Sequence, residues 1–261
     1  MATRTIEGSR AIVTGASSGI GRAIAKELAR QGGKVVALAR REDRLLALAK
    51  EIELEHGNVV CVAGDVTDPA ARARCIEGAQ THFGGLDILV NNAGVGAIGP
   101  FETADPQRVR RLMEVNFFAL VEMTRAALPL LKEGRRPIIV NVSSILGRRG
   151  VPYNSEYAAS KFAVHGFSES IRAEFSSAGI DVLVVSPGTT NTEFFDQVLE
   201  SKGGPKWPEH TAVTPETVAR ATVRAIRRGS HEITPYLWGK VLVLLNRVSP
   251  WMVDQLMARY A

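Results

Sequence analysis

The chain alternates between short apolar runs and longer amphipathic stretches. Six runs have the length of a strand and are apolar at almost every position, as in strands covered on both faces: residues 11–13, 35–39, 59–63, 86–90, 138–142 and 182–185. Between the runs, apolar residues recur at helical spacing, for example at Ile20, Ile24 and Leu28. Further helices are expected after Asp43, Pro69, Pro106, Ser155 and Pro215.

This alternation predicts a doubly wound α/β domain. Strands that alternate with helices are joined by right-handed crossovers, which build a parallel sheet with helices on both faces. We expect a Rossmann-like sheet of about seven strands in a single domain over residues 1–261, because no long linker-like segment divides the sequence. Sheets of this kind bind ligands beyond the carboxyl ends of their strands.

A glycine-rich segment, TGASSGIG at residues 14–21, directly follows the first apolar run. Gly15 would permit a tight exit from the strand, Gly19 a close approach of the backbone to a diphosphate, and Gly21 close packing of the helix on the sheet. The amino end of that helix would offer unpaired N–H groups to an anion. A plain strand-to-helix turn is the alternative, but the position in the first unit of the fold favours a ligand site.

Composition and charge narrow the possible partners. The formal net charge is +5, but the basic residues are scattered, which argues against nucleic-acid binding and suits a small anionic ligand. Two cysteines, Cys61 and Cys75, exclude a disulfide framework and a cysteine-based zinc site, and the five histidines show no metal-ligand spacing. The first residues show no apolar signal segment, so we expect a cytoplasmic protein.

The spacing of the glycines, with Thr14 in front, resembles the short-chain dehydrogenase/reductase family. The resemblance continues in family order over about residues 8–193, through these features: NNAG at residues 91–94, Asn116, Ser144, Tyr157-x3-Lys161, Pro187 with Gly188, and Thr192. It implies an oxidoreductase that transfers a hydride between a nicotinamide dinucleotide and a carbonyl or alcohol. The alternative is a non-catalytic nucleotide-binding sensor or scaffold, which would have no chemical need for Asn116, Ser144, Tyr157 and Lys161 together.

The expected chemistry depends on a tyrosine made acidic. Tyr157 and Lys161 lie one helical turn apart, so both project from one face. The ammonium is expected to lower the pKa of the phenol, ordinarily about 10, so that Tyr157 can shuttle a proton. Ser144 would hold the substrate oxygen. The family pattern implies that Lys161 also bonds the nicotinamide ribose and that Asn116 supports it through a water relay, whereas His165 is given no role.

The resemblance also implies a set of cofactor contacts. Asp65 is expected near the adenine, with capping of the next helix as the alternative, and Asn92 is expected to brace the sheet rather than to touch the cofactor. The full set is Gly15, Ser17, Ser18, Gly19, Ile20, Gly21, Arg40, Asp65, Val66, Asn91, Ala93, Gly94, Tyr157, Lys161, Pro187, Gly188, Thr190 and Thr192.

The end of the second apolar run indicates which dinucleotide is used. NAD-dependent enzymes of this architecture usually carry an acidic residue there, which bonds the ribose 2′-hydroxyl. In this chain the corresponding residue is Ala39, and Arg40 and Arg41 follow it. We therefore predict NADP(H) rather than NAD(H), with Arg40 bonding the 2′-phosphate. The alternative is that both arginines are solvated charges ahead of the next helix.

Substrate and assembly are less sharply defined by the sequence. Residues 192–211 contain aromatic side chains and are expected to form a lid. Together with Val95, Leu146, Val151 and Tyr153 they would enclose an apolar pocket for a hydrophobic carbonyl compound. Packing in the core explains these apolar residues equally well. The apolar segment 236–261 is expected to be a lid or a subunit interface, and the resemblance implies a homodimer or homotetramer. Peripheral membrane contact is the alternative, disfavoured because no continuous basic helical face is evident.

Overall fold

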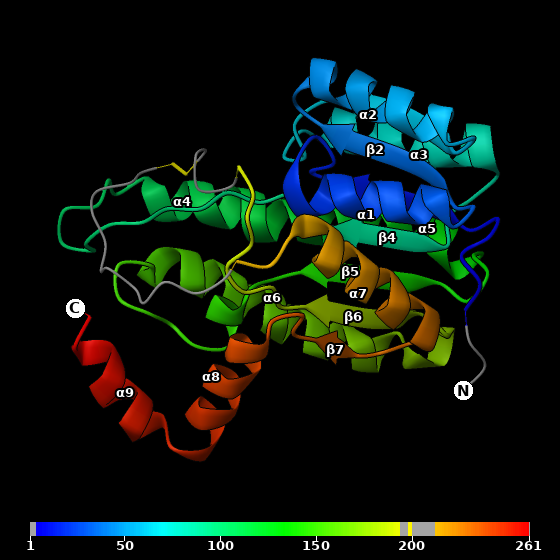
Figure 1. Cartoon of the computed structure of the whole chain (residues 1–261). Coiled ribbons are helices and arrows are strands. Elements are labelled where there is room, and N and C mark those ends of the chain that lie inside the picture. Colours follow the sequence, from blue (N-terminus) through cyan, green and yellow to red (C-terminus); the bar gives the residue numbers. More distant parts are fainter. Residues whose placement is uncertain (1–3, 194–197, 200–211, 261) are drawn as a thin grey trace.

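The computed structural model describes residues 4–193, 198–199 and 212–260, and within these ranges strands and helices alternate (Figure 1). The strands are β1 (Arg10–Thr14), β2 (Lys34–Ala39), β3 (Asn58–Ala63), β4 (Ile88–Asn91), β5 (Ile138–Val142), β6 (Asp181–Val185) and β7 (Glu232–Ile233). The helices are α1 (Gly19–Arg30), α2 (Glu42–Leu54), α3 (Pro69–Phe83), α4 (Arg108–Met113), α5 (Ala119–Lys132), α6 (Ser155–Glu174), α7 (Pro215–Arg228), α8 (Leu237–Val248) and α9 (Pro250–Ala258). Short helical turns are η1 (Glu114–Phe118), η2 (Ile145–Gly147) and η3 (Ser176–Ala178).

The seven strands form one parallel sheet in the order β3-β2-β1-β4-β5-β6-β7. The strand order reverses between β1 and β4, which is where a sheet of this type opens a crevice at its carboxyl edge. The predicted fold class is confirmed, and each of the six apolar runs falls on a strand. The seventh strand, β7, has only two residues and no apolar run of its own, so the pattern along the chain does not reveal it.

Helices cover both faces of the sheet and bury a separate apolar core on each. Residues of α1, α2 and α7 pack on one face, and residues of α3, α5 and α6 pack on the other. Side chains alternate along each strand between the two cores, so that Ala11 and Val13 of β1 belong to the first core and Ile12 to the second. All three are almost fully buried. Burial on both faces explains why the strands appear in the sequence as continuous apolar runs.

Gly21 shows how closely α1 packs against the loop after β4. A Cβ atom at this position would lie 2.2 Å from Asn92 Nδ2 and 2.4 Å from the carbonyl oxygen of Gly15. No room exists for it, so Gly21→Ala is expected to lower the free energy of unfolding by about 3 kcal/mol, through overpacking.

Gly166 provides the matched control for this stability prediction. It lies in the interior of α6, where a Cβ atom would have no neighbour within 4 Å. Gly166→Ala is therefore expected to raise the free energy of unfolding by about 0.5–1 kcal/mol, because alanine loses less backbone entropy in a helix. Urea denaturation of both variants measures the difference. Equal effects of the two substitutions would contradict the packing argument.

The sequence singled out two segments, residues 192–211 and 236–261. Most of the expected lid, residues 194–197 and 200–211, lies outside the described residues. Helices α8 and α9 form an arm that projects from the body at the lower left of Figure 1. Neither of these helices, nor any other in the described part of the chain, combines the length and the apolar character needed to cross a bilayer.

Candidate active site

A cavity of about 1020 Å³ lies at the carboxyl edge of the sheet. Its walls are formed by the segments that follow β1, β2, β3, β4, β5 and β6, together with α6, α8 and α9. The predicted site residues that line it are Gly15, Ser17, Ser18, Gly19, Ile20, Arg40, Asp65, Val66, Ala93, Gly94, Ser144, Tyr157, Lys161, Pro187, Gly188, Thr190 and Thr192. The topology thus gathers residues from distant parts of the chain into one site.

Three predicted site residues do not line this cavity: Gly21, Asn91 and Asn116. For Asn91 the expected contact is one of its backbone with the adenine ribose, and it stays a prediction. Its side chain is buried inside the fold, where Nδ2 donates hydrogen bonds of 3.0 Å to Thr124 Oγ1 and Asn141 Oδ1. As the last residue of β4, Asn91 directs its side chain toward α5.

Asn92, the next residue, lines the cavity and also connects β4 to the glycine-rich turn. Its Nδ2 donates to the carbonyl oxygens of Thr14 at 3.0 Å and Gly15 at 3.3 Å. The Thr14 hydroxyl in turn accepts hydrogen bonds of 3.0 Å from the backbone N–H groups of Asn92 and Ala93. These bonds hold the ends of β1 and β4 together at the point where the strand order reverses.

Two sets of contacts hold the amino-terminal turns of α6, which carry Tyr157. Glu156 forms a buried ion pair with Arg108 of α4. Ser160 Oγ donates to the carbonyl oxygen of Tyr157 at 2.7 Å and accepts a hydrogen bond of 2.9 Å from Asn116 Nδ2. Packing and hydrogen bonds therefore leave little freedom in the direction of the Tyr157 side chain.

Asn116 also secures the loop that follows β4. Its Oδ1 accepts from the backbone N–H of Val95 at 2.8 Å, and its Nδ2 donates to the Val95 carbonyl oxygen at 3.0 Å. Asn116 lies in the π-helical turn η1 and is almost fully buried. The described contacts make it a positioning residue; the water relay to Lys161 stays a prediction.

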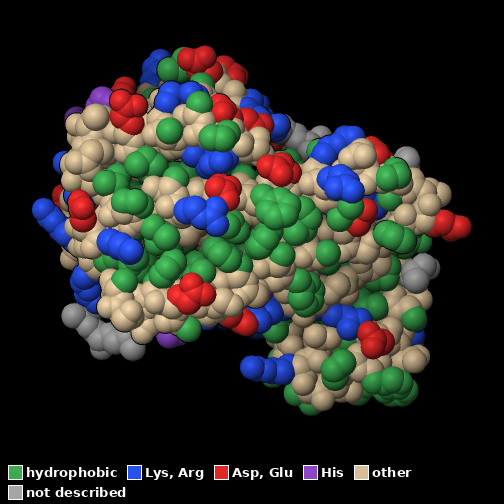
Figure 2. Space-filling model, turned by 180° about the vertical axis from the view of Figure 1, so that it is seen from behind, with side chains coloured by type: hydrophobic (Ala, Val, Ile, Leu, Met, Phe, Trp, Pro, Cys, Tyr) green, Lys and Arg blue, Asp and Glu red, His purple; other side chains and the backbone are tan. Residues whose placement is uncertain are grey.

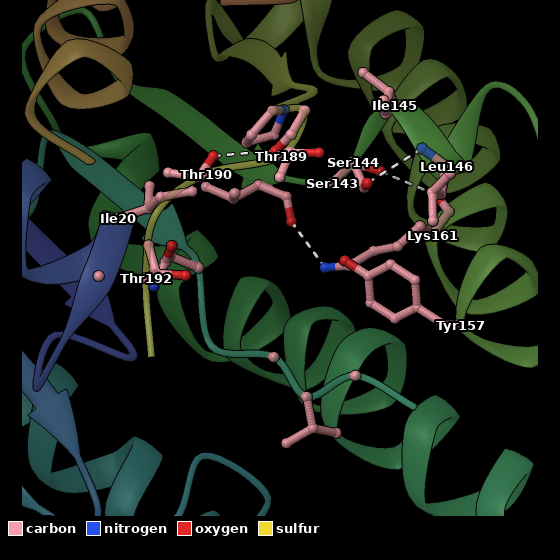
Figure 3. A pocket seen from close by; sticks show the side chains of 18 of the residues that line it. Ile20, Ser143, Ser144, Ile145, Leu146, Tyr157, Lys161, Thr189, Thr190 and Thr192 are labelled. Atoms are coloured by element: carbon pink, nitrogen blue, oxygen red, sulfur yellow. Dashed lines mark hydrogen bonds between the residues drawn. The ribbon is translucent and has the colours of Figure 1, made fainter. Parts of the chain in front are cut away.

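Ser144, Tyr157 and Lys161 point into one end of the cavity (Figure 3). Ser144 is the second residue after β5, and its Oγ accepts a hydrogen bond of 3.1 Å from the backbone N–H of Leu146. Lys161 Nζ donates to the carbonyl oxygen of Val142 at 3.1 Å and lies 5.8 Å from the centre of the Tyr157 ring. A hydroxyl, a phenol and an ammonium thus meet where a substrate oxygen would have to lie.

The local environment shifts the pKa values of Tyr157 and Lys161 away from their ordinary values. Burial raises the pKa of Tyr157 to about 12, while a hydrogen bond with Ser144 acts in the opposite direction. Burial lowers the pKa of Lys161 to about 8. In the protein alone, desolvation therefore outweighs the expected effect of the ammonium on the phenol. The physical reason is that both side chains are buried and have lost their contact with solvent.

The buried ammonium should destabilise the folded protein at neutral pH. The pKa of Lys161 falls from an ordinary 10.5 to about 8, which corresponds to a cost of about 3 kcal/mol at pH 7, where the folded protein still holds the proton. Lys161→Met removes this cost but leaves the Val142 carbonyl without its donor, a loss of about 1 kcal/mol. We expect the variant to be inactive and its free energy of unfolding at pH 7 to rise by about 2 kcal/mol.

The stability difference between the wild type and Lys161→Met should depend on pH if the buried charge of Lys161 causes it. Between the folded pKa of about 8 and the ordinary 10.5, the unfolded wild-type chain binds a proton that the folded chain does not. Wild-type stability therefore rises with pH in this window relative to the variant. Denaturant titrations at intervals from pH 7 to 10.5 should show the advantage of Lys161→Met shrinking; a constant advantage would contradict a buried charge.

Arginines cover the other end of the cavity, next to the glycine-rich turn. Arg41 Nη2 donates to the hydroxyls of Ser17 at 3.2 Å and Ser18 at 2.7 Å. Arg40 is mostly exposed, and its Nη1 lies 3.9 Å from Asp65 Oδ2. Both arginines line the cavity. The sequence places two cations here but does not reveal that Arg41, rather than Arg40, contacts the serines.

An apolar wall forms the outer part of the cavity. Val95, Leu146 and Val151 belong to it as predicted, whereas Tyr153 lies outside. The arm supplies apolar side chains that were not assigned individually: Trp238, Val241, Leu242, Leu245, Leu256 and Met257. Their only signal in the sequence is the apolar density of residues 236–261, which does not distinguish a cavity wall from an interface.

His165 lies behind the site and does not line the cavity. It is buried, with Nε2 at 3.2 Å from Ser186 Oγ. Burial lowers its pKa to about 4, so the imidazole is neutral at neutral pH. A role in proton transfer has no geometric support.

The residues at the glycine-rich end fit a dinucleotide. Gly15 and Gly19 have positive φ values of 67° and 54°, and a Cβ atom at Gly19 would lie 3.2 Å from Thr192 Cγ2. The first turn of α1 contains no acidic residue, and its amino end faces the cavity. Backbone N–H groups and the helix dipole therefore suit an anionic diphosphate there, and the arginines suit a further phosphate. Lys161 and Thr192 would hold the nicotinamide end.

The sequence of this chain is similar to those of known proteins. A family model for short chain dehydrogenase matches residues 9–203. The chain is 31% identical to a 3-ketodihydrosphingosine reductase of Bacteroides thetaiotaomicron, with 94% of each protein covered. It is 30% identical to the ketoacyl reductase HetN of a Nostoc species, over 97% of this chain and 89% of that protein.

Solved structures agree with these relatives. A short chain dehydrogenase from Burkholderia cenocepacia in complex with NADP has a TM-score of 0.77 and 29% identity, over 88% of this chain and 97% of that one. A short chain dehydrogenase/reductase from Burkholderia phymatum in complex with NAD has a TM-score of 0.86 over 95% and 96% of the chains; at 24% identity it shows the fold alone. Fold and sequence lead to one conclusion: the chain belongs to the short-chain dehydrogenase/reductase family of oxidoreductases.

Proposed function

We propose that this protein is a cytoplasmic carbonyl reductase that transfers a hydride from NADPH to the carbonyl carbon of a hydrophobic substrate. The observation that carries the proposal is the meeting of Ser144, Tyr157 and Lys161 in the cavity that also contains the glycine-rich turn. A binding protein without catalysis would not need a hydroxyl, a phenol and an ammonium together at this end of the cavity.

In the proposed mechanism the chain positions the substrate oxygen and supplies the proton. The Ser144 hydroxyl donates a hydrogen bond to the carbonyl oxygen and stabilises the negative charge that develops on it. Tyr157 donates its phenolic proton to the same oxygen, so that carbonyl, hydride and proton together give the alcohol. The nearby Lys161 ammonium stabilises the phenolate that remains. When bound, NADPH supplies the hydride.

The preference for NADP(H) rests on charge at the end of β2. Ala39 stands where NAD-dependent enzymes usually carry a carboxylate. Arg40 and Arg41 line the cavity directly after it. Arg41 lies over the serines of the glycine-rich turn and forms an ion pair of 3.2 Å with Glu193. The 2′-phosphate would replace Glu193 as the partner of Arg41 and would draw Arg40 away from Asp65. We therefore assign the phosphate to this pair rather than to Arg40 alone.

The preference for a hydrophobic substrate rests on the outer cavity wall. Apolar side chains from α8 and α9 line the same cavity as Ser144 and Tyr157. A ketone or aldehyde on a bulky or long apolar group would replace water along this wall and gain the corresponding hydrophobic free energy.

Initial rates with a panel of carbonyl compounds test the proposal. We expect oxidation of NADPH with apolar ketones or aldehydes, at a higher kcat/KM than with NADH and higher than with small polar ketoacids. A clear preference for NADH would overturn the cofactor assignment. Binding of NADPH without turnover of any carbonyl or alcohol in the panel would favour the sensor or scaffold alternative.

We also propose that the protein forms a homodimer or homotetramer through α5 and α6. Figure 2 shows a broad group of hydrophobic side chains across the face opposite α1 and α7. Phe118 and Phe162 are 49% and 46% exposed at the start of α5 and on α6. Aromatic side chains that are exposed on a flat helical face are typical of a subunit interface. Light scattering coupled to size-exclusion chromatography measures the assembly.

A further inference from the structure

The arm formed by α8 and α9 is fastened to the loop that carries Ser144. Arg149, in this loop, donates from Nη1 to Asn246 Oδ1 at 3.1 Å and from Nη2 to Asp254 Oδ1 at 2.6 Å. Asn246 Nδ2 donates back to the carbonyl oxygen of Arg148 at 3.3 Å. One residue, Arg149, thus binds both helices of the arm, and the orientation of the arm relative to the cavity is defined.

Beyond the side that lines the cavity, the arm presents a second apolar surface to solvent. We define this outer face by Leu237, Leu244, Val248, Trp251 and Met252, which are between 59% and 77% exposed. None of them lines the cavity. The three residues on α8 are spaced seven and four apart, so they form one stripe along the helix. Figure 2 shows hydrophobic side chains at the far end of the projecting arm.

Cations lie beside this stripe. Lys240 and Arg247 are seven residues apart on α8 and therefore share one edge of the helix, three residues from Leu237 and Leu244, respectively. Both are exposed. Residues 236–261 contain a single acidic residue, Asp254, which is bonded to Arg149. The surface of the arm is therefore apolar and cationic. The sequence already places Lys240 and Arg247 beside apolar residues, and the helix sets both on one edge of α8.

The cations on the arm favour an anionic partner for the outer face over a second copy of the arm. A second copy of the arm in a two-fold contact would bring the same cations together and offer no acidic residue of the arm to pair with them. An anionic lipid surface would attract the cations and accept the apolar stripe. An exposed tryptophan such as Trp251 is also favoured at a bilayer interface, where the ring lies at the level of the headgroups.

We propose that the arm docks on the surface of an anionic bilayer, with the outer face inserted at the level of the headgroups. The helices lie on the membrane rather than across it, because an amphipathic helix with basic residues beside an apolar stripe binds in the interfacial plane. In this position α8 lies between the bilayer and the cavity, with one side facing each. The docking itself does not depend on the proposed function.

Flotation of the full chain with lipid vesicles tests the docking. We expect the protein to rise with vesicles that contain about one third phosphatidylserine, and to rise far less with pure phosphatidylcholine or at high salt. The double variant Leu244→Gln and Trp251→Gln should lose at least tenfold in affinity for the anionic vesicles. Lys240→Gln with Arg247→Gln should lose about 25-fold, or about fivefold for each cation.

Two exposed leucines elsewhere provide the matched control. Leu46 and Leu54 on α2 are 60% and 72% exposed, and Leu46→Gln with Leu54→Gln should float like the wild type. Failure of the wild type to rise with the vesicles would overturn the proposal. So would an equal loss of affinity in the Leu244 and Trp251 variant and in the Leu46 and Leu54 control. So would unchanged flotation of the Leu244 and Trp251 variant, in particular if light scattering showed that the variant forms a smaller assembly, because the outer face would then contact a second copy.

A vesicle-free assay separates this proposal from the proposed function. Leu244 and Trp251 do not line the cavity. Their variant should therefore keep the wild-type circular dichroism spectrum and the wild-type rate with a small water-soluble ketone in buffer. Absence of reductase activity in the wild type would contradict the proposed function and leave the flotation result unaffected.

Discussion

Tyr157→Phe is expected to lower kcat for carbonyl reduction about 10³-fold, the usual contribution of a positioned general acid. The substitution removes one hydroxyl group, which is the group that donates the proton in the proposed mechanism and that hydrogen bonds with Ser144. The ring remains, so the cavity keeps its shape, and NADPH should bind with nearly unchanged affinity. Steady-state rates and the quenching of protein fluorescence by NADPH measure the two quantities separately.

Tyr153→Phe is the control for this loss. Tyr153 lies four residues before Tyr157 and outside the cavity. Removal of its hydroxyl is the same chemical change at almost the same place in the chain, and kcat should stay within about twofold of the wild type. Comparable activity in the two variants would remove Tyr157 from the mechanism. A tenfold loss of NADPH affinity in Tyr157→Phe would point instead to a binding role.

Ala39→Asp is expected to reverse the cofactor preference. Ala39 ends β2, and its side chain is buried next to Arg40 and Arg41 at the cavity. A carboxylate there would repel the 2′-phosphate of NADPH and would accept hydrogen bonds from the ribose of NADH. Since juxtaposed like charges cost several kcal/mol, the ratio of kcat/KM for NADPH to that for NADH should fall by a factor of about 10² or more.

Ala39→Asn separates charge from size in this experiment. The amide has nearly the shape of the carboxylate but no charge, so it introduces the same crowding at the end of β2 without the repulsion. We expect it to change the cofactor ratio by less than about tenfold. If both variants changed the ratio equally, crowding rather than electrostatics would set the preference, and the assignment of the 2′-phosphate to the arginines would be wrong.

The elements of the fold could be predicted because their signals are local. A strand covered on both faces is apolar at almost every position, so β1, β2, β4, β5 and β6 are visible as runs. The edge strand β3 is only partly buried, but its apolar side chains also pack against both cores. The strand β7 is held by its pairing with β6, in which Val184 and Val185 lie beside Glu232 and Ile233. That contact joins residues almost fifty positions apart, so a local pattern cannot reveal it.

The site was predictable in its members but not in their orientation. The motifs identify residues at the ends of successive strands, and a parallel sheet brings those ends to one edge. Which of two adjacent side chains faces the cavity depends on packing on both sides of the strand. For this reason the sequence does not show that the Asn91 side chain is buried beside Thr124, or that Arg41 rather than Arg40 lies on the serines.

The sequence by itself determined the α/β class, the family and the residue types available for chemistry, because apolar period, glycine spacing and motif order are properties of the chain. Only the tertiary structure decided the electrostatic state of Tyr157 and Lys161, since their pKa values depend on the burial that distant segments impose. It also decided that one side of α8 lines the cavity while Leu244 on the other meets solvent. Burial and facing directions arise only when elements pack, which is why no local pattern contains them.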